Sequence, residues 1–232
     1  MKLRAVVASA WRNSNRSQAP RHDLAWIVLI ALVAALVRLF VVVRFSGEPV
    51  WDGHYYHFGA VRLASGLGYS EDVIKQGVLV WKPWTHYPVG YSFWLSLWYR
   101  IFGSKLWVAP LSNAVVGTAT VVLIYAVSRP FLGTWRARLA AALAALHPGL
   151  VLYTAVAMSE PLAACLLIAS VWPLLYVRRR ILAASLAGVL LGASVLVRPS
   201  SLVALPLYWF LVGGAWNATS AASRSSAAPL SS

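Results

Sequence analysis

Asp52 is the first residue whose type and position could do chemistry. It lies in Val50-Trp-Asp-Gly-His-Tyr-Tyr56, just beyond the first long apolar run of the chain. A carboxylate positioned there could take a proton from a hydroxyl group, which contributes roughly 10²–10⁴-fold to a reaction rate. An exposed loop acid or a helix cap, with Gly53 as a turn residue, explains the same position. Asp52 is therefore the candidate general base, and the structural alternative stays open.

Glu160 is the one acidic residue after position 72, and it lies between two apolar runs in Ala157-Met-Ser-Glu-Pro161. A charge in hydrocarbon costs at least about 2.5–3.5 kcal/mol at the centre of a helix, so such residues usually face a cavity or a partner. This favours a substrate-binding carboxylate at a cavity rim. A first-turn acid that complements a helix N-terminus, with Ser159 as the cap and Pro161 at the first position, also explains the pattern, and the two interpretations are compatible with each other.

Basic and aromatic residues near the predicted helix ends are further candidates for binding a substrate. Arg198 and Arg38 could bind phosphate oxygens, because a guanidinium group matches phosphate with paired hydrogen bonds. Snorkelling to lipid head groups is the commoner fate of an arginine near a helix end. The segment after the first apolar run supplies the remaining substrate-binding candidates: Tyr56, Lys82, His86 and Tyr87.

Support for a metal or another cofactor is weaker. His54 and His57 lie three residues apart beside Asp52, a spacing that could hold a divalent metal, but two histidines and one acid are an incomplete ligand set. The sequence has no GxxxxGKS loop, no paired CxxC, no HExxH and no GxSxG. These absences disfavour an ATPase, a zinc protease and an esterase.

The elements that must position these residues are expected in a membrane. Of the 232 residues, 60% are hydrophobic and 11% are charged, whereas soluble domains are about 45–50% apolar and about 25% charged. The net charge of +14 could suggest nucleic acid. However, the basic residues occur in short clusters between apolar runs, as in cytoplasmic loops. We therefore predict an integral membrane protein without a nucleic-acid partner.

The predicted fold is all-α, a polytopic bundle of about five to seven membrane helices. We divide the chain into a basic cytoplasmic tail (1–22), a transmembrane module (23–215) and a disordered Ser/Ala-rich tail (216–232). The module contains a long external loop, about 45–88, for which short amphipathic helices are expected. The predicted helical runs are Asp23–Arg44, Gly90–Phe102, Leu106–Val127, Leu139–Met158 with an interruption at His147-Pro148-Gly149, Pro161–Val177, Ile181–Val197 and Leu202–Val212.

Charge predicts the orientation of these runs. The basic tail, the loop 129–138 and the loop 178–180 fall on one side of the membrane, which the positive-inside rule makes the cytoplasm. Asp52, the stretch before Glu160, and Arg198 then fall on the opposite side. Orientation alone therefore predicts that the unusual polar residues gather at the external face.

The order of several short motifs resembles a known family over about residues 24–210. The motifs are Trp51-Asp52 with Tyr55-Tyr56, Leu63-Ala-Ser-Gly-Leu-Gly-Tyr69, His86-Tyr-Pro-Val-Gly-Tyr91, Ile101-Phe-Gly103, His147-Pro-Gly149, Met158-Ser-Glu-Pro-Leu162 and Leu196-Val-Arg-Pro199. This series resembles the N-terminal module of the GT-C superfamily of membrane glycosyltransferases, in the protein mannosyltransferase-like and aminoarabinose transferase-like branch. Members of that branch are usually longer and carry further helices.

The resemblance implies an inverting transfer of a sugar from a polyprenyl-phosphate donor to a hydroxyl acceptor on a glycan, lipid or protein. It implies that Asp52 is the general base, that Glu160 lies near the same cavity and that Arg198 engages the lipid phosphate. Some members use a divalent metal and others do not. A bacterial inner or plasma membrane, with a cytoplasmic N-terminus and an external active face, is the expected location.

Two other classes of function remain open. A secondary transporter or flippase would also carry charged residues near the membrane and helices interrupted by Gly or Pro, although no internal repeat is visible. An inactive or truncated homologue, or a non-catalytic membrane subunit, would fit the shorter chain.

Overall fold

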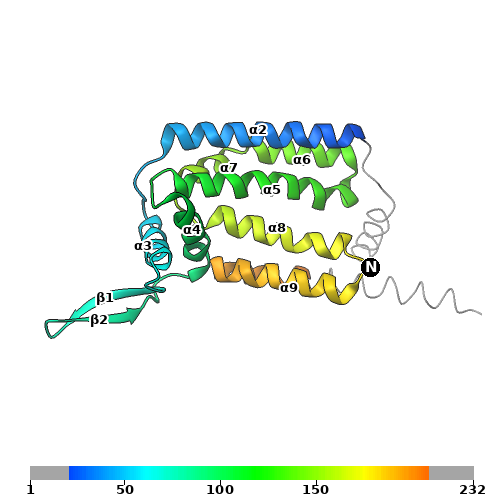
Figure 1. Cartoon of the computed structure of the whole chain (residues 1–232). Coiled ribbons are helices and arrows are strands. Elements are labelled where there is room, and N and C mark those ends of the chain that lie inside the picture. Colours follow the sequence, from blue (N-terminus) through cyan, green and yellow to red (C-terminus); the bar gives the residue numbers. More distant parts are fainter. Residues whose placement is uncertain (1–20, 209–232) are drawn as a thin grey trace, which may run out of the picture.

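The computed structural model describes residues 21–208 and is dominated by a bundle of helices that run side by side (Figure 1). Helix α5 packs against α2, α6 and α8, and α8 packs against α9. Small residues, such as Ala34, Ala137 and Ala141, are fully buried where α2, α5 and α6 meet. The bundle helices are α2 (Arg21–Phe45), α5 (Val108–Leu132), α6 (Thr134–Leu146), α8 (Glu160–Tyr176) and α9 (Arg180–Val197).

A second group of elements lies across one end of the bundle. Helices α3 (Gly53–Ala64) and α4 (Val89–Phe102) pack against each other there, and α4 also contacts α5 and α9. Short helical turns complete the same end, namely α7 (Pro148–Leu152), η1 (Tyr153–Ala155) and η2 (Pro199–Ala204). The amphipathic helix predicted in the external loop is confirmed as α3, with Tyr56 and Ala60 buried. This end therefore holds the loops expected to face away from the cytoplasm.

The predicted all-α membrane bundle is confirmed, but with fewer clear spans than expected. Within residues 21–208, three helices are long and apolar enough to cross a membrane: Asp23–Phe45, Val108–Leu132 and Arg180–Val197. A fourth span results if α6 and the stretch Pro148–Ala155, which meet at a 50° bend, count as one. Helix α8 is apolar and has 17 residues, the lower limit for a crossing. The predicted C-terminal tail (216–232) lies wholly outside the described residues. The predicted N-terminal tail (1–22) lies outside them except for its last two residues, and the run Leu202–Val212 is described only as far as residue 208.

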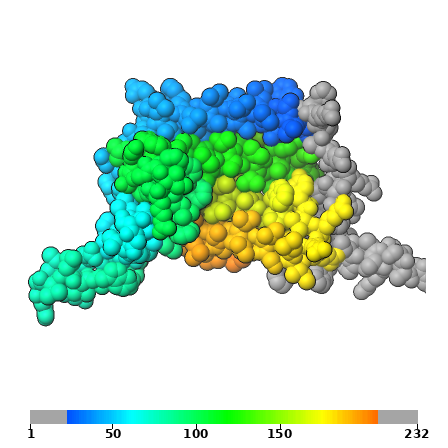
Figure 2. All heavy atoms as spheres, viewed as in Figure 1, coloured from blue at the N-terminus to red at the C-terminus, as the bar shows by residue number. Residues whose placement is uncertain are grey.

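The external loop also contains a β-hairpin, which the sequence analysis did not predict. Strands β1 (Ser70–Lys75) and β2 (Val78–Pro83) pair antiparallel, and the hairpin protrudes from the end that carries α3 and α4 (Figure 2). Gln76 and Gly77 between them both have positive φ, 51° and 78°, as a two-residue type I′ turn requires. The β-branched residues of both strands favour the extended conformation that the turn closes.

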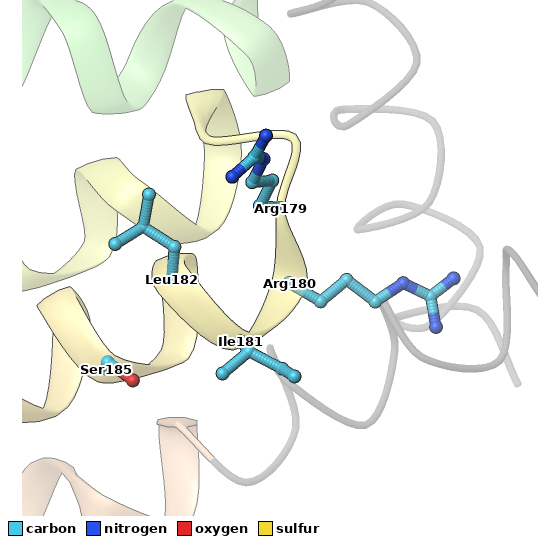
Figure 3. A pocket seen from close by; sticks show the side chains of 5 residues that line it. All are labelled: Arg179, Arg180, Ile181, Leu182 and Ser185. Carbon is cyan, nitrogen blue, oxygen red and sulfur yellow. The ribbon is translucent and has the colours of Figure 1, made fainter.

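Basic residues occupy the opposite end of the bundle, where α5 leads into α6 and α8 into α9. Figure 3 shows Arg179 and Arg180 at the start of α9, beside a cavity of about 690 Å³ that Ile181, Leu182 and Ser185 also line. At the same end Asp23, only 1% exposed, pairs with Arg138 at 2.9 Å and with Arg129 at 3.6 Å and accepts a hydrogen bond from Tyr125. This cluster ties α2, α5 and α6 together.

We expect Asp23→Asn to lower the unfolding temperature by roughly 10 °C, because removing one partner of a buried ion pair costs about 3–5 kcal/mol. A thermal-shift measurement on the purified protein checks this. Glu71→Gln is the matched control, since Glu71 pairs with Lys82 on the exposed hairpin at 3.4 Å and surface pairs contribute about 0–1 kcal/mol. Equal shifts for the two variants would contradict the structural role assigned to the Asp23 cluster.

Candidate functional site

Asp52 lies immediately before α3, at the end of the bundle opposite the basic loops. It occupies the cap position, but its side chain makes no capping hydrogen bond. Its Oδ1 instead accepts a hydrogen bond from the Tyr87 hydroxyl at 3.0 Å. The preceding residue, Trp51, is exposed and has a φ of 48°, a conformation that is costly for a bulky residue and is often found at functional sites.

Tyr87 is itself held in place by aromatic neighbours and by its backbone. Its ring stacks on Tyr55 with centroids 4.8 Å apart and meets Tyr56 edge-on at 5.3 Å. Its carbonyl accepts a hydrogen bond from the Tyr69 hydroxyl at 2.9 Å. The hydrogen bond to Asp52 is the main cause that raises the pKa of the Tyr87 hydroxyl. Tyr87 therefore stays protonated at neutral pH and donates to the carboxylate.

Glu160 and Arg198 form the second part of the site. Glu160 lies in the first turn of α8 and Arg198 directly follows α9, and Arg198 Nη1 is 2.7 Å from Glu160 Oε1. The same nitrogen is 3.4 Å from Ser159 Oγ. Both charged side chains are partly exposed. Glu160 therefore occupies the first helical turn, as one of the two sequence interpretations predicted. The sequence did not specify Arg198 as the partner of this carboxylate.

Ser159 and Tyr56 connect the two parts of the site. Ser159 is fully buried and makes no capping hydrogen bond, contrary to the cap role considered from the sequence. Its hydroxyl lies 3.2 Å from that of Tyr56, whose ring contacts Tyr87. Burial is the main cause that raises the pKa of Tyr56, and the charges of Asp52 and Glu160 raise it further. The acids, Arg198 and both tyrosines therefore form one electrostatic environment.

Close backbone packing keeps this geometry. A Cβ placed on Gly53 would lie 3.5 Å from the Cβ of Ala157, so the start of α3 rests on the segment that leads into α8. Asn113 of α5 stabilises that segment, because its Nδ2 donates a hydrogen bond to the Val156 carbonyl at 2.7 Å. The Tyr91 hydroxyl donates to Asn113 Oδ1 at 3.1 Å, and both side chains are fully buried. Residues of α4 and α5 thus support the segment that leads into α8 and Glu160.

Arg38 lies apart from the Asp52 and Arg198 contacts. It is fully buried in α2, and its Nη1 donates to the carbonyls of Ala34 and Ala145 at 3.2 and 3.1 Å. Ala145 lies in the last turn of α6, where the break at Pro148 removes the hydrogen-bond donor that a continuing helix would supply. A cation is favourable at a helix C-terminus. These contacts give Arg38 a structural role at the bend between α6 and α7.

The remaining sequence candidates are distributed around the α3 end. Lys82 pairs with Glu71 on the hairpin, and exposed His86 lies against Trp84 with ring centroids 4.8 Å apart. His57 Nδ1 is 2.7 Å from the Tyr99 hydroxyl, and burial lowers the pKa of this histidine. Among residues 21–208, no three His, Cys, Asp or Glu side chains gather where a metal ion could bind. His54 and His57 are therefore not part of a metal-binding group in the described structure.

We expect Tyr87→Phe to lower by about tenfold the rate of any reaction in which Asp52 is the base, because the carboxylate loses a hydrogen bond that orients it. Initial rates at saturating substrate measure this effect. Tyr55→Phe is the control, since it preserves the stacked ring beside Tyr87. A rate for Tyr87→Phe equal to that of the control would contradict a positioning role for the Tyr87 hydroxyl.

Comparison with known proteins adds a family assignment for most of the chain. Residues 86–228 match the family model described as dolichyl-phosphate-mannose-protein mannosyltransferase. The match includes Tyr87, Glu160 and Arg198, whereas Asp52 and Tyr56 precede it. No curated protein and no solved structure matches the chain.

Proposed function

Since this chain belongs to the dolichyl-phosphate-mannose-protein mannosyltransferase family of GT-C membrane glycosyltransferases, we propose that it transfers a sugar from a polyprenyl-phosphate donor to a hydroxyl acceptor. The reaction inverts the anomeric centre and takes place at the external membrane–water interface. The observation that carries the proposal is the connection of Asp52 to the Glu160–Arg198 pair through Tyr87, Tyr56 and Ser159.

In this reaction the acceptor oxygen attacks the anomeric carbon as Asp52 takes the hydroxyl proton. The bond from the anomeric carbon to the phosphate oxygen breaks, and polyprenyl phosphate leaves with one more negative charge. Stabilisation of such developing charge is usually the largest catalytic effect. Arg198 supplies it, because its side chain is 44% exposed and its guanidinium group has N–H groups beyond those of the nitrogen that contacts Glu160 and Ser159.

Glu160 supports this role of Arg198. The 2.7 Å ion pair holds the guanidinium group beside Ser159, so that the arginine is oriented before the donor binds. Orientation of catalytic groups in advance reduces the entropy lost in the reaction. Lys82, His86 and Arg38 are not needed for the transfer step in this proposal, because they are engaged elsewhere.

The proposed location is a bacterial inner or plasma membrane, in which the end of the bundle that carries α3 and α4 lies on the external side. The basic loops between α5 and α6 and between α8 and α9 lie at the opposite end of the bundle, which supports a cytoplasmic position for them. The acceptor is then an external glycan, lipid or protein that carries a hydroxyl group.

A transfer assay in proteoliposomes tests the proposal. The purified full chain is supplied with radiolabelled polyprenyl-phosphate hexoses and with cell-envelope extract as the acceptor, and both label transferred and label taken into the lumen are counted. We expect covalent transfer without net uptake. Uptake without transfer would overturn the proposal in favour of a transporter. Label in neither fraction, although the protein is folded and its donor is bound, would overturn it in favour of a non-catalytic subunit.

A further inference from the structure

Aromatic side chains gather on α3 and the segment after β2, beside Asp52. Tyr55 and Phe58 lie three residues apart on one face of α3 and are 43% and 39% exposed. Trp84, which follows β2, meets the Tyr55 and Phe58 rings with centroids 6.0 and 5.1 Å apart. Tyr87 stacks on Tyr55 at 4.8 Å. We call these four residues, Tyr55, Phe58, Trp84 and Tyr87, the aromatic platform.

The aromatic platform is continuous with the proposed base. The Tyr87 hydroxyl donates to Asp52 Oδ1 at 3.0 Å, and both Asp52 and Tyr55 are exposed. Exposed His86 meets the Trp84 ring with centroids 4.8 Å apart, so its ring nitrogens can form hydrogen bonds at the edge of the platform. A molecule that lies on these rings therefore reaches the carboxylate that is proposed to take the acceptor proton.

A belt of aromatic residues at the membrane interface does not account for this arrangement. Trp and Tyr in such belts lie at the level of the lipid head groups. Helix α4 contacts α5 and α9 at the end of the bundle, whereas α3 packs against α4 and lies beyond it (Figure 1). The platform residues on α3 are therefore carried on the far side of α4, where an acceptor from the aqueous phase arrives.

The charges in this region disfavour an acceptor that binds through a phosphate group. Arg62 lies 5.8 Å from the centroid of the Phe58 ring, but it is buried and binds Asp72 at 2.8 Å. Lys82 is 3.4 Å from Glu71. Each of these cations is thus paired with a carboxylate, and Asp52 adds a negative charge that repels an anion.

An extended peptide would lack partners for its main chain on the aromatic platform. Peptides often bind along a free strand edge, because their backbone N–H and C=O groups need hydrogen-bond partners. The backbone N–H of Trp84 already donates to the Tyr69 carbonyl at 3.0 Å, and the Tyr87 carbonyl accepts from the Tyr69 hydroxyl. The platform thus presents ring surfaces in place of a strand edge.

We infer that the hydroxyl acceptor is an uncharged glycan, whose sugar rings stack on the aromatic platform while one hydroxyl group reaches Asp52. This inference rests on the proposed function, because it names the class of the acceptor. The C–H groups on one face of a sugar ring match the negatively polarised faces of aromatic rings. The other hydroxyl groups of the glycan form hydrogen bonds with His86 at the edge of the platform.

Binding of uncharged oligosaccharides to the full chain in nanodiscs tests the inference without requiring transfer. The probes are linear tetrasaccharides of mannose, glucose and galactose, and saturation-transfer NMR reports the protons of the bound sugar. We expect the wild type to bind at least one of them, with an affinity that Tyr55→Leu lowers about three- to tenfold. Leucine keeps an apolar side chain at position 55 but removes the ring. Tyr55→Phe keeps the ring and should bind as the wild type does.

Trp81→Leu is the matched control, since Trp81 is 59% exposed on β2 and lies outside the aromatic platform. Phe58→Leu is a second platform variant, which should weaken binding even if Tyr55→Leu fails to fold. Equal affinities of the two platform variants and the control would overturn the inference. Failure of every oligosaccharide to bind the folded wild type would overturn it as well.

A serine- and threonine-rich peptide in the same assay tests the class of acceptor, because the family description names a protein mannosyltransferase. Peptide binding that Tyr55→Leu weakens, without glycan binding, would overturn the choice of a glycan. Glycan binding through the platform without any sugar transfer contradicts only the proposed function. Transfer to an acceptor that both platform variants leave unchanged contradicts only the inference.

Discussion

Asp52→Asn is expected to reach the membrane at the wild-type level and to lose sugar transfer by about 10²–10⁴-fold. Asparagine has nearly the same shape and can still accept the Tyr87 hydrogen bond, but it cannot take a proton from the acceptor hydroxyl. The loss should therefore appear in kcat, with little change in donor binding. Initial rates of radiolabelled transfer with the purified variant measure it.

Glu48→Gln is the matched control for this substitution. It removes one negative charge from the same loop, and the Glu48 side chain is exposed. We expect it to retain wild-type transfer. If Asp52→Asn also retained it, the base would be another group, and the alternative of Asp52 as an exposed loop acid would be favoured.

Gly90→Ala is expected to lower transfer by about a hundredfold, although Gly90 lies outside the reacting groups. A Cβ at Gly90 would lie 2.6 Å from backbone atoms of Leu196 and Val197, so α4 and α9 must separate to accept it. Arg198 directly follows those two residues. Displacement of a catalytic group by about 1 Å can cost 10²-fold in rate, and overpacking costs about 1–3 kcal/mol of stability.

Gly188→Ala provides the comparison for Gly90. Gly188 lies within α9, and a Cβ there would meet nothing within 4 Å. Alanine should stabilise the helix at that position by about 0.5–1 kcal/mol and leave transfer unchanged. Transfer rates and unfolding temperatures of both variants check this. Normal activity of Gly90→Ala would show that the contact of α4 with α9 does not position Arg198.

The bounds of the apolar helices could be predicted from the sequence. Apolar runs such as Ile181–Val197 match α9 to within one residue, because the hydrophobic length and the flanking arginines both specify the helix. The proline after His147 likewise marks the observed break. The hairpin was missed because its apolar residues lie in a polar loop, where Gln76 gives a weaker turn signal than Asn or Asp before Gly77.

The site was predictable in part, for a topological reason. Alternating helices bring Asp52, Glu160 and Arg198 to one end, but the ion pair between Glu160 and Arg198 is a side-chain contact that the sequence does not specify. Ser159, Tyr91 and Asn113 were not predicted as parts of the site, since their roles depend on which side chain meets which across the packed elements. Whether a basic residue such as Lys82 faces the site or the hairpin is decided by cross-strand register, which the sequence does not reveal.

The start of α3, which follows Asp52, is packed against the segment before Glu160, and the proposed site depends on this contact. An engineered disulfide between the two segments tests the contact most directly. Gly53→Cys with Ala157→Cys would place two Cβ atoms about 3.5 Å apart, within the range of disulfides. The background is Cys165→Ser, which removes the single native cysteine. Ser65→Cys with Ala157→Cys is the control, because Ser65 lies at the far end of α3.

Mild oxidation in membranes, followed by mass spectrometry of the digested protein, measures the crosslink. We expect rapid formation of the intramolecular disulfide between positions 53 and 157 and none between 65 and 157. If the pair at 53 and 157 stayed reduced under conditions that oxidise exposed thiols, Asp52 and Glu160 would not share a site.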